Sequence, residues 1–382
     1  MSDFSMSDDT FFYLKDSDKV LQSRISELEH KDAKSFGAYL DIIQTHFRNR
    51  GKLKEQGEYS SNKMKSVTEA LRQLWVVEAE KGSTFEIFKD FETFEGFLFQ
   101  SEDYRGHYVH QFDVFLLGFY LLNKIMEKDS GPISNNLHVS SNPNFTWMLT
   151  ATFHDMGYPI EQINNWFSRF LKMFLKVETP YQLEVRNILP PTFFEYLKYL
   201  SEEHYNLTTD QIAVSGQSYI RDWQFHNCLE TKLLRKDHGV ISSLLLIHSL
   251  LTQEKIKQFH TWFVSTFPYE IMPACHAISL HNFDNSEMKD LKISLSKYPY
   301  AFLLLLCDTL QDWQRSVQTQ DYSELTEIQF SFPNGIPTID FRLKINAPRK
   351  FEELDKMKNR LITHGLIKIT IRQENGSRVW EL

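Results

Sequence analysis

The sequence predicts a mainly α-helical protein with a small α+β domain at its C-terminus. Three observations lead to this fold class. Apolar residues recur at helical spacing over most of the first 315 residues. The chain has 31 phenylalanines but only 14 glycines and 12 prolines, which favours helices over a turn-rich β-sandwich. After about Leu325, apolar and polar residues begin to alternate, which is typical of strands.

Composition and charge narrow the class of protein. The 382 residues leave room for two or three domains, and a hydrophobic content of 42% indicates a folded chain. The formal net charge of −8 argues against a broad nucleic-acid-binding surface. Three cysteines without metal-type spacing suit a reducing cytoplasm. The longest apolar runs, at 240–251 and 300–307, are too short to span a bilayer. We therefore expect a cytoplasmic protein with no membrane segment.

The chain is expected to divide into three parts. Residues 1–100 form an N-terminal helical region, 101–322 a larger helical core, and 323–382 a small domain of ββαββ type. The strands of the last part are expected at 328–332, 338–345, 366–372 and 378–382, and its helix at 348–364, closed by Gly365. Within the core, the aromatic segment 161–237 is interpreted either as helical packing or as a lid over a site.

The most informative stretch is the pair His154-Asp155, which ends an apolar segment that begins at Phe145. A buried carboxylate requires a salt bridge, a dense set of hydrogen bonds or a metal ion. A lone His-Asp pair does not distinguish among these. Gly157 and Pro159 are predicted to end the helix just after the pair.

Residues of metal-binding type also interrupt four other apolar helices. They are His110 in 104–128, His238 before 240–251, His276 or His281 in 274–282, and Asp308 in 300–315. Five separate helices that each carry such a residue favour a metal site over a set of unrelated structural histidines. Imidazole and carboxylate ligands without cysteine suit Mn, Fe, Co, Ni or Zn, and suit Mg less well.

This order of residues resembles the HD-domain superfamily of metal-dependent phosphohydrolases, whose signature is H…HD…H…H…D. The similarity runs from about Arg105 to Arg315 and includes local sequences around each position. These are His110 with Val114, Lys236-Asp237-His238-Gly239, Ala277-Ile278-Ser279-Leu280-His281, and Leu306-Cys307-Asp308-Thr309-Leu310-Gln311-Asp312. The resemblance implies that residues 101–322 form an HD-domain helical core.

The resemblance also implies a centre of two divalent transition metal ions. One ion would be held by His110, His154, Asp155 and Asp308. The other would be held by Asp155, acting as a bridge, together with His238 and His281. His154 and Asp155 would be the catalytic pair, and a hydroxide that bridges the ions would attack phosphorus.

Two further histidines leave alternatives open. His107 lies three residues before His110 and therefore on the same helix face, where it could be a ligand, an outer group of the site or a substrate contact. We prefer His110, because its spacing to Val114 fits the family pattern. His276 precedes His281 by five residues and ranks second to it as a ligand.

The implied activity is hydrolysis of a nucleotide or related phosphoester, as in phosphodiesterases and other phosphohydrolases. An anionic substrate needs cationic contacts, and the nearest candidates in the sequence are Arg105, Lys236 and Arg315. Arg315 would share a helix face with Asp308, although a structural pair with Asp312 is equally compatible with the spacing. No Gly-Tyr-Pro motif follows His281, which weakens an assignment to cyclic-di-GMP.

Two other functions fit the same residues. A diiron oxygenase could use this ligand set for O₂ chemistry, and oxygen-dependent turnover with an iron signal would favour it. A non-catalytic sensor could bind a nucleotide tightly without turnover. In each case we expect the 323–382 domain to be regulatory or to mediate homo-oligomerisation.

Overall fold

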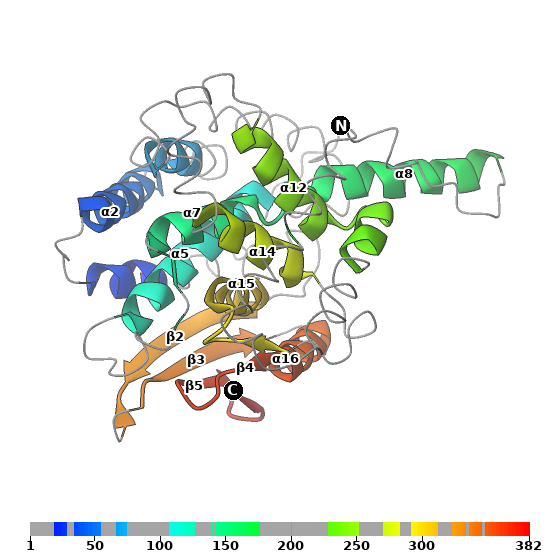
Figure 1. Ribbon diagram of the computed structural model, residues 1–382. Helices are drawn as coiled ribbons and strands as arrows, with labels where there is room; N and C mark the ends of the chain where they lie inside the picture. Colours follow the sequence, from blue (N-terminus) through cyan, green and yellow to red (C-terminus); the bar gives the residue numbers. More distant parts are fainter. Residues whose placement is uncertain are drawn as a thin grey trace, which may run out of the picture. The chain divides into compact units, whose positions relative to one another are not determined.

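The computed structural model is mainly helical, with a small sheet region toward the C-terminus (Figure 1), which confirms the predicted fold class at this level. It describes residues 19–28, 34–54, 66–74, 107–126, 137, 139–140, 142–175, 200, 228–251, 270–282, 292–311, 323–333, 336–345 and 348–382. Two compact units are present: a first unit of residues 1–139 and 291–382, and a second unit of residues 140–290. The expected three-part domain division stays a prediction.

The helices of the first unit are built around α5 (His107–Ile125), which is buried on every side from His110 to Asn123. Helix α2 (Lys34–Lys54) contributes aromatic side chains to this core: the rings of Phe36 and Tyr39 stack on Phe119 at centroid distances of 5.6 and 6.1 Å. Helix α15 (Pro299–Leu310) packs against α5 as well. The apolar side chains of α2 that contact α5 therefore belong to the core of this unit.

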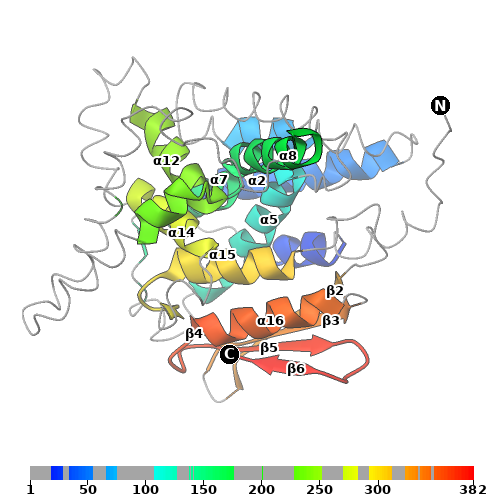
Figure 2. The same ribbon diagram turned by 90° about the vertical axis from the view of Figure 1, so that its right-hand side faces the viewer.

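The C-terminal part of the first unit is a four-stranded mixed sheet in the order β2-β3-β5-β6. Its strands are β2 (Ser323–Ser331), β3 (Thr338–Ile345), β5 (Lys368–Gln373) and β6 (Val379–Glu381). Strands β3 and β5 are parallel, and the connection between them contains the crossover helix α16 (Pro348–Arg360). Figure 2 shows α16 lying along one face of the sheet, with α15 on the other side of α16.

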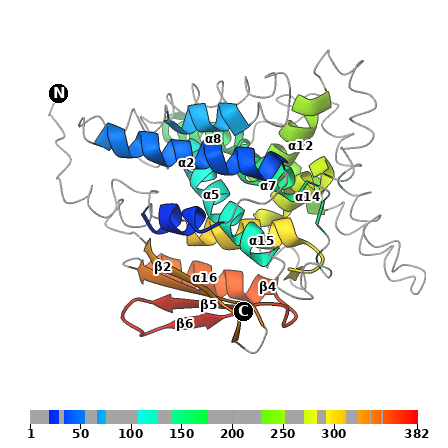
Figure 3. The same cartoon turned by 90° about the vertical axis from the view of Figure 1, so that its left-hand side faces the viewer.

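The two faces of this sheet differ as strand alternation requires. On one face a row of paired residues crosses all four strands and is buried: Ile328, Phe341, Ile371 and Trp380. The other face carries exposed ion pairs, such as Arg342 with Glu327 at 2.8 Å. Figure 3 shows β5 and β6 at the far edge of the sheet from α15. Along the chain these elements follow in the order β2, β3, α16, β4, β5 and β6.

Strand β2 begins at Ser323 and not at 328, and the region around the helix also differs from the prediction. The helix ends at Arg360 and not at His364, and a short strand β4 (Leu361–Ile362) follows it directly. Strand β4 pairs in parallel with β1 (Ile293–Ser294), the two-residue strand that precedes α15. Gly365 was expected to close the helix, but it lies in the turn after β4, where its φ of +72° suits a glycine.

The second unit consists of helices packed around α14 (Met272–His281). Helices α12 (His238–Leu251) and α7 (Pro143–Phe153) both contact α14, and α8 (Tyr158–Leu175) contacts α12. At the start of α7, the Glu270 carboxylate accepts the backbone N–H of Asn142 at 3.1 Å and the Thr146 hydroxyl at 3.2 Å. Among the described helices, none has the length and apolar content that a membrane crossing needs.

The alternation of the sheet yields a paired test on neighbouring residues of β3. We expect Phe341→Ala to destabilise the protein by about 3–5 kcal/mol, because it leaves a cavity under the central strand. Arg342→Ala, one residue further on and exposed, should cost at most about 1 kcal/mol. Thermal unfolding followed by circular dichroism measures both. Equal losses for the two variants would contradict the assignment of faces.

Candidate metal centre

His154 and Asp155 lie in a turn between two helices. Helix α7 ends at Phe153, with His154 as its C-terminal cap, and the turn runs through Gly157 into α8. Pro159 was expected to help stop the helix, but it lies in the first turn of α8. Proline is favoured at that place because its missing N–H would have no helical partner there. The pair is thus held at the junction of two helices.

The turn is packed tightly against the start of α12. The backbone N–H of Gly157 donates to the Ser242 hydroxyl at 2.7 Å. A Cβ atom at Gly157 would lie only 2.5 Å from the His238 carbonyl oxygen, so no larger residue fits without movement. This close approach brings Asp155 and His238 together, although 83 positions separate them.

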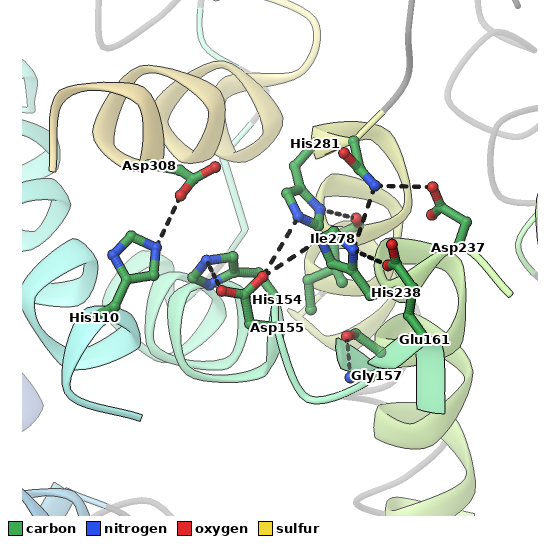
Figure 4. Close-up of polar contacts among 12 residues, drawn as sticks. His110, His154, Asp155, Gly157, Glu161, Asp237, His238, Ile278, His281 and Asp308 are labelled. Atoms are coloured by element: carbon green, nitrogen blue, oxygen red, sulfur yellow. Dashed lines mark hydrogen bonds and ion pairs between the residues drawn. The ribbon is translucent and has the colours of Figure 1, made fainter. Parts of the chain in front are cut away.

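The carboxylate of Asp155 faces three imidazole rings, as Figure 4 shows. Its Oδ2 atom is 3.4 Å from His154 Nε2. Its Oδ1 atom is 3.5 Å from His238 Nε2 and 4.0 Å from His281 Nε2. Asp155, His154 and His281 are buried, and the His238 side chain is 15% exposed. One carboxylate therefore has histidine on both of its oxygens.

The rings of His154 and His281 are oriented by backbone carbonyls. Nδ1–H of His154 donates to the Ala151 carbonyl at 2.8 Å, and Nδ1–H of His281 donates to the Ile278 carbonyl at 2.6 Å. Both residues follow the last turn of a helix or end it, where carbonyls lack an intrahelical partner. A proton on Nδ1 leaves the lone pair on Nε2, the atom that faces Asp155.

His238 is oriented by a side chain. Its Nδ1 lies 2.7 Å from the Glu161 Oε2 atom, at the start of α8. Burial lowers the pKa of His238, but the hydrogen bond to Glu161 and the charges of Asp155, Glu161 and Asp237 outweigh that effect and raise it to about 9. The carboxylates around this ring therefore favour its protonated form.

A partly buried ion-pair network joins the two helix ends that carry His238 and His281. The Lys232 ammonium donates to the Asp237 carboxylate at 2.9 Å and to the Asn282 carbonyl at 2.9 Å. The Asn282 amide donates to the same carboxylate at 2.9 Å. Asp237 also accepts the Val240 N–H at 3.1 Å, which caps α12. The network therefore ties the start of α12 to the end of α14.

The first unit holds the other two predicted ligands close together. His110 Nε2 on α5 is 2.9 Å from Asp308 Oδ1 on α15. Nδ1 of His110 is hydrogen-bonded to Oε1 of Gln311, whose amide nitrogen lies 3.4 Å from the Asp113 carboxylate. The same anchoring principle holds here, because an acceptor on Nδ1 directs Nε2 toward the carboxylate.

Helix α15 ends before Arg315. The helix was expected to continue through that residue, but it ends at Leu310, and Gln311 leaves the helical conformation with ψ 87°. Gln311 turns its side chain inward to His110. Arg315 itself lies outside the described residues, as does Arg105.

The remaining candidates lie as follows. His107 is the first residue of α5, and nothing further is described of its side chain. His276 is buried within α14 and belongs to neither group of residues that could hold a metal ion. Lys236 precedes α12 with a left-handed backbone, φ 62°, and burial lowers its pKa. Most of the aromatic segment 161–237 beyond Leu175 lies outside the described residues.

The donor set fits a metal ion. Within the second unit, Asp155, His238 and His281 each offer a ligand atom, and these atoms lie within 4.8 Å of one another. An ion about 2.1 Å from a nitrogen and an oxygen holds them about 3.0–3.4 Å apart at ordinary bond angles. The distances of 3.4, 3.5 and 4.0 Å from Asp155 to the imidazoles are near this range and exceed a normal hydrogen bond.

Buried His and Asp groups of this chain could therefore hold metal ions; the residues concerned are His110, His154, Asp155, His238 and His281. Comparison with known proteins gives no relative: no protein-family model, curated protein or solved structure matches the chain.

Gly239 provides a test of the metal position at His281. A Cβ atom at this residue would lie 2.9 Å from His281 Cε1 and 3.0 Å from its Nδ1. The ring is anchored to the Ile278 carbonyl, so Gly239→Ala must displace it. We expect affinity for Mn²⁺ to fall about 10-fold or more by isothermal titration calorimetry, with retained helix content. Gly376→Ala, in an exposed turn, is the control and should keep wild-type affinity; unchanged affinity in Gly239→Ala would contradict the role of His281.

Proposed function

We propose that this protein is a metal-dependent phosphohydrolase with an HD-type dinuclear centre, acting on a nucleotide or a related phosphoester. The observation that carries the proposal is the Asp155 carboxylate, whose two oxygens face Nε2 atoms of different histidines. A carboxylate placed between two sets of imidazoles is suited to bridge two ions. The H…HD…H…H…D order supports the reaction class by resemblance.

The two oxygens of Asp155 define the two metal positions of this proposal. The Oδ1 side, with His238 and His281, would hold one ion with ligands of the second unit alone. The Oδ2 side, with His154, needs further ligands for the other ion. From the family pattern, we assign these to His110 and Asp308. Within the first unit, His110 Nε2 lies 2.9 Å from Asp308 Oδ1.

The ligand residues have defined tasks in this reaction. Divalent ions at such a centre supply Lewis acidity, lower the pKa of a water molecule and neutralise phosphate charge. The imidazoles must present neutral Nε2 atoms, and the hydrogen bonds on Nδ1 secure this tautomer for His154 and His281. To serve as a ligand, His238 would have to lose the proton on Nε2, which the hydrogen bond to Glu161 and the surrounding carboxylates stabilise by raising the pKa of the ring.

The hydrolysis itself uses water and the ester alone. A new bond forms between phosphorus and the oxygen of water, and the bond between phosphorus and the leaving oxygen breaks. The leaving oxygen takes a proton that derives from water. Lys236, buried just before His238, is our candidate for a contact with the phosphate; Arg105 and Arg315 remain candidates by sequence.

Asp155→Asn tests the bridge with little change in shape. We expect bound metal, measured by inductively coupled plasma mass spectrometry after loading with Mn²⁺, to fall from about two ions per chain to one or none. Turnover in a metal-supplemented screen of mono-, tri-, cyclic and oligonucleotides should fall at least about 100-fold, because several kcal/mol of charge stabilisation are lost.

Glu270→Gln is the matched control for this experiment, since Glu270 is equally buried in the second unit but lies at the opposite end of α7 from His154. It should retain both ions. Release of phosphate or nucleotide without O₂ would separate hydrolysis from a diiron oxygenase, and nucleotide binding without any product would indicate a sensor. Full metal content and activity in Asp155→Asn would refute the proposed centre.

A further inference from the structure

The anchoring of His238 differs in kind from that of the other two histidines around Asp155. His154 and His281 each donate to a carbonyl three residues earlier in their own helix. His238 is the first residue of α12, and a helix N-terminus exposes N–H groups but no unpaired carbonyls. Its Nδ1–H therefore needs an acceptor from elsewhere, and Glu161 of α8 supplies it at 2.7 Å.

Among the described neighbours of this ring nitrogen, Glu161 is the group that can accept its proton. The Asn282 amide nitrogen lies 3.4 Å from His238 Nδ1, but it is a donor and is directed to Asp237 at 2.9 Å. Tyr158, at a ring-centroid distance of 5.9 Å, meets His238 edge-on and only packs against it. The direction of His238 Nε2 toward Asp155 Oδ1 consequently depends on Glu161.

We infer that Glu161 is a positioning residue for the metal held by Asp155, His238 and His281. The inference rests on the proposed metal centre and extends it to α8, which carries none of the six predicted ligands. A carboxylate that accepts Nδ1–H fixes the tautomer and rotamer of a ligating histidine and strengthens its Nε2 as a donor. Loss of such an outer partner typically weakens metal binding about 10–100-fold.

The effect should be confined to one of the two metal positions. Glu161 contacts His238 alone among the predicted ligands, and His238 faces Oδ1 and not Oδ2 of Asp155. The ion beside His154 should therefore keep its affinity when Glu161 is changed. A general loss of structure in α8 would not produce this selectivity.

The test compares metal-free wild type with Glu161→Ala, Glu161→Gln and Gln162→Ala. Gln162, the next residue of α8 and also half-buried, is the matched control for the helix. Each protein is titrated with Mn²⁺ by isothermal titration calorimetry, and Co²⁺ spectra report the ligand environment. Circular dichroism and the unfolding midpoint check that each variant is folded.

We expect Glu161→Ala to weaken one of two Mn²⁺ sites about 10–100-fold, with the other unchanged. Glu161→Gln should stay within about 3-fold of wild type, since its amide oxygen still accepts Nδ1–H. Gln162→Ala should match wild type. The inference is overturned if Glu161→Ala binds two ions at wild-type affinity, if Glu161→Gln loses as much as Glu161→Ala, or if Gln162→Ala shows the same loss. A wild-type protein that binds no metal would instead refute the proposed centre, and this inference with it.

Discussion

The structure of the second unit depends on keeping one buried carboxylate, Asp155, among three imidazoles. A charged group in such a place is costly unless opposite charges or dense hydrogen bonds surround it. Here the compensation comes from positions far apart in sequence, which requires the ends of α7, α12 and α14 to meet at one point. The tight glycine contacts at Gly157 and Gly239 fit that requirement, because at each one a helix end that carries one of these residues touches its neighbour.

The histidines of the site are oriented differently at the C-terminal and N-terminal ends of helices. His154 and His281 stand at C-terminal ends and use backbone carbonyls that would otherwise lack partners. His238 stands at an N-terminal end and takes a carboxylate from α8. In the first unit the acceptor is a side-chain amide: Gln311 is hydrogen-bonded to Nδ1 of His110, whose Nε2 lies beside Asp308. In the four histidines, Nδ1 is engaged and Nε2 is turned toward a carboxylate.

The sequence predicted the parts of this arrangement that have a local signature. Residues of ligand type on apolar helices identified His110, His154, His238, His281 and Asp308, and alternation identified β2, β3, β5 and β6. Glu161 and Gln311 were missed, because their partners lie 77 and 201 residues away and a lone Glu or Gln on a helix end carries no pattern. Strands β1 and β4 were missed because two residues are too few to show a period.

Two expected helix boundaries were wrong. The sequence predicts that Pro159 helps to end a helix, but in the structure it lies in the first turn of α8. Proline suits both places, and the sequence does not distinguish between them. The helix expected over 300–315 ends at Leu310, and the Gln311 side chain is hydrogen-bonded to His110. Tertiary contacts decided both cases, and they are not visible in periodicity.

The most direct test of the account is anomalous X-ray diffraction at the manganese edge from crystals grown with Mn²⁺. We expect two anomalous peaks, one on each side of the Asp155 carboxylate. One should lie near Nε2 of His238 and His281, and the other near Nε2 of His154. Each peak should lie about 2.1 Å from a carboxylate oxygen. Absence of any peak within bonding distance of Asp155, in crystals that bind Mn²⁺ elsewhere, would contradict it.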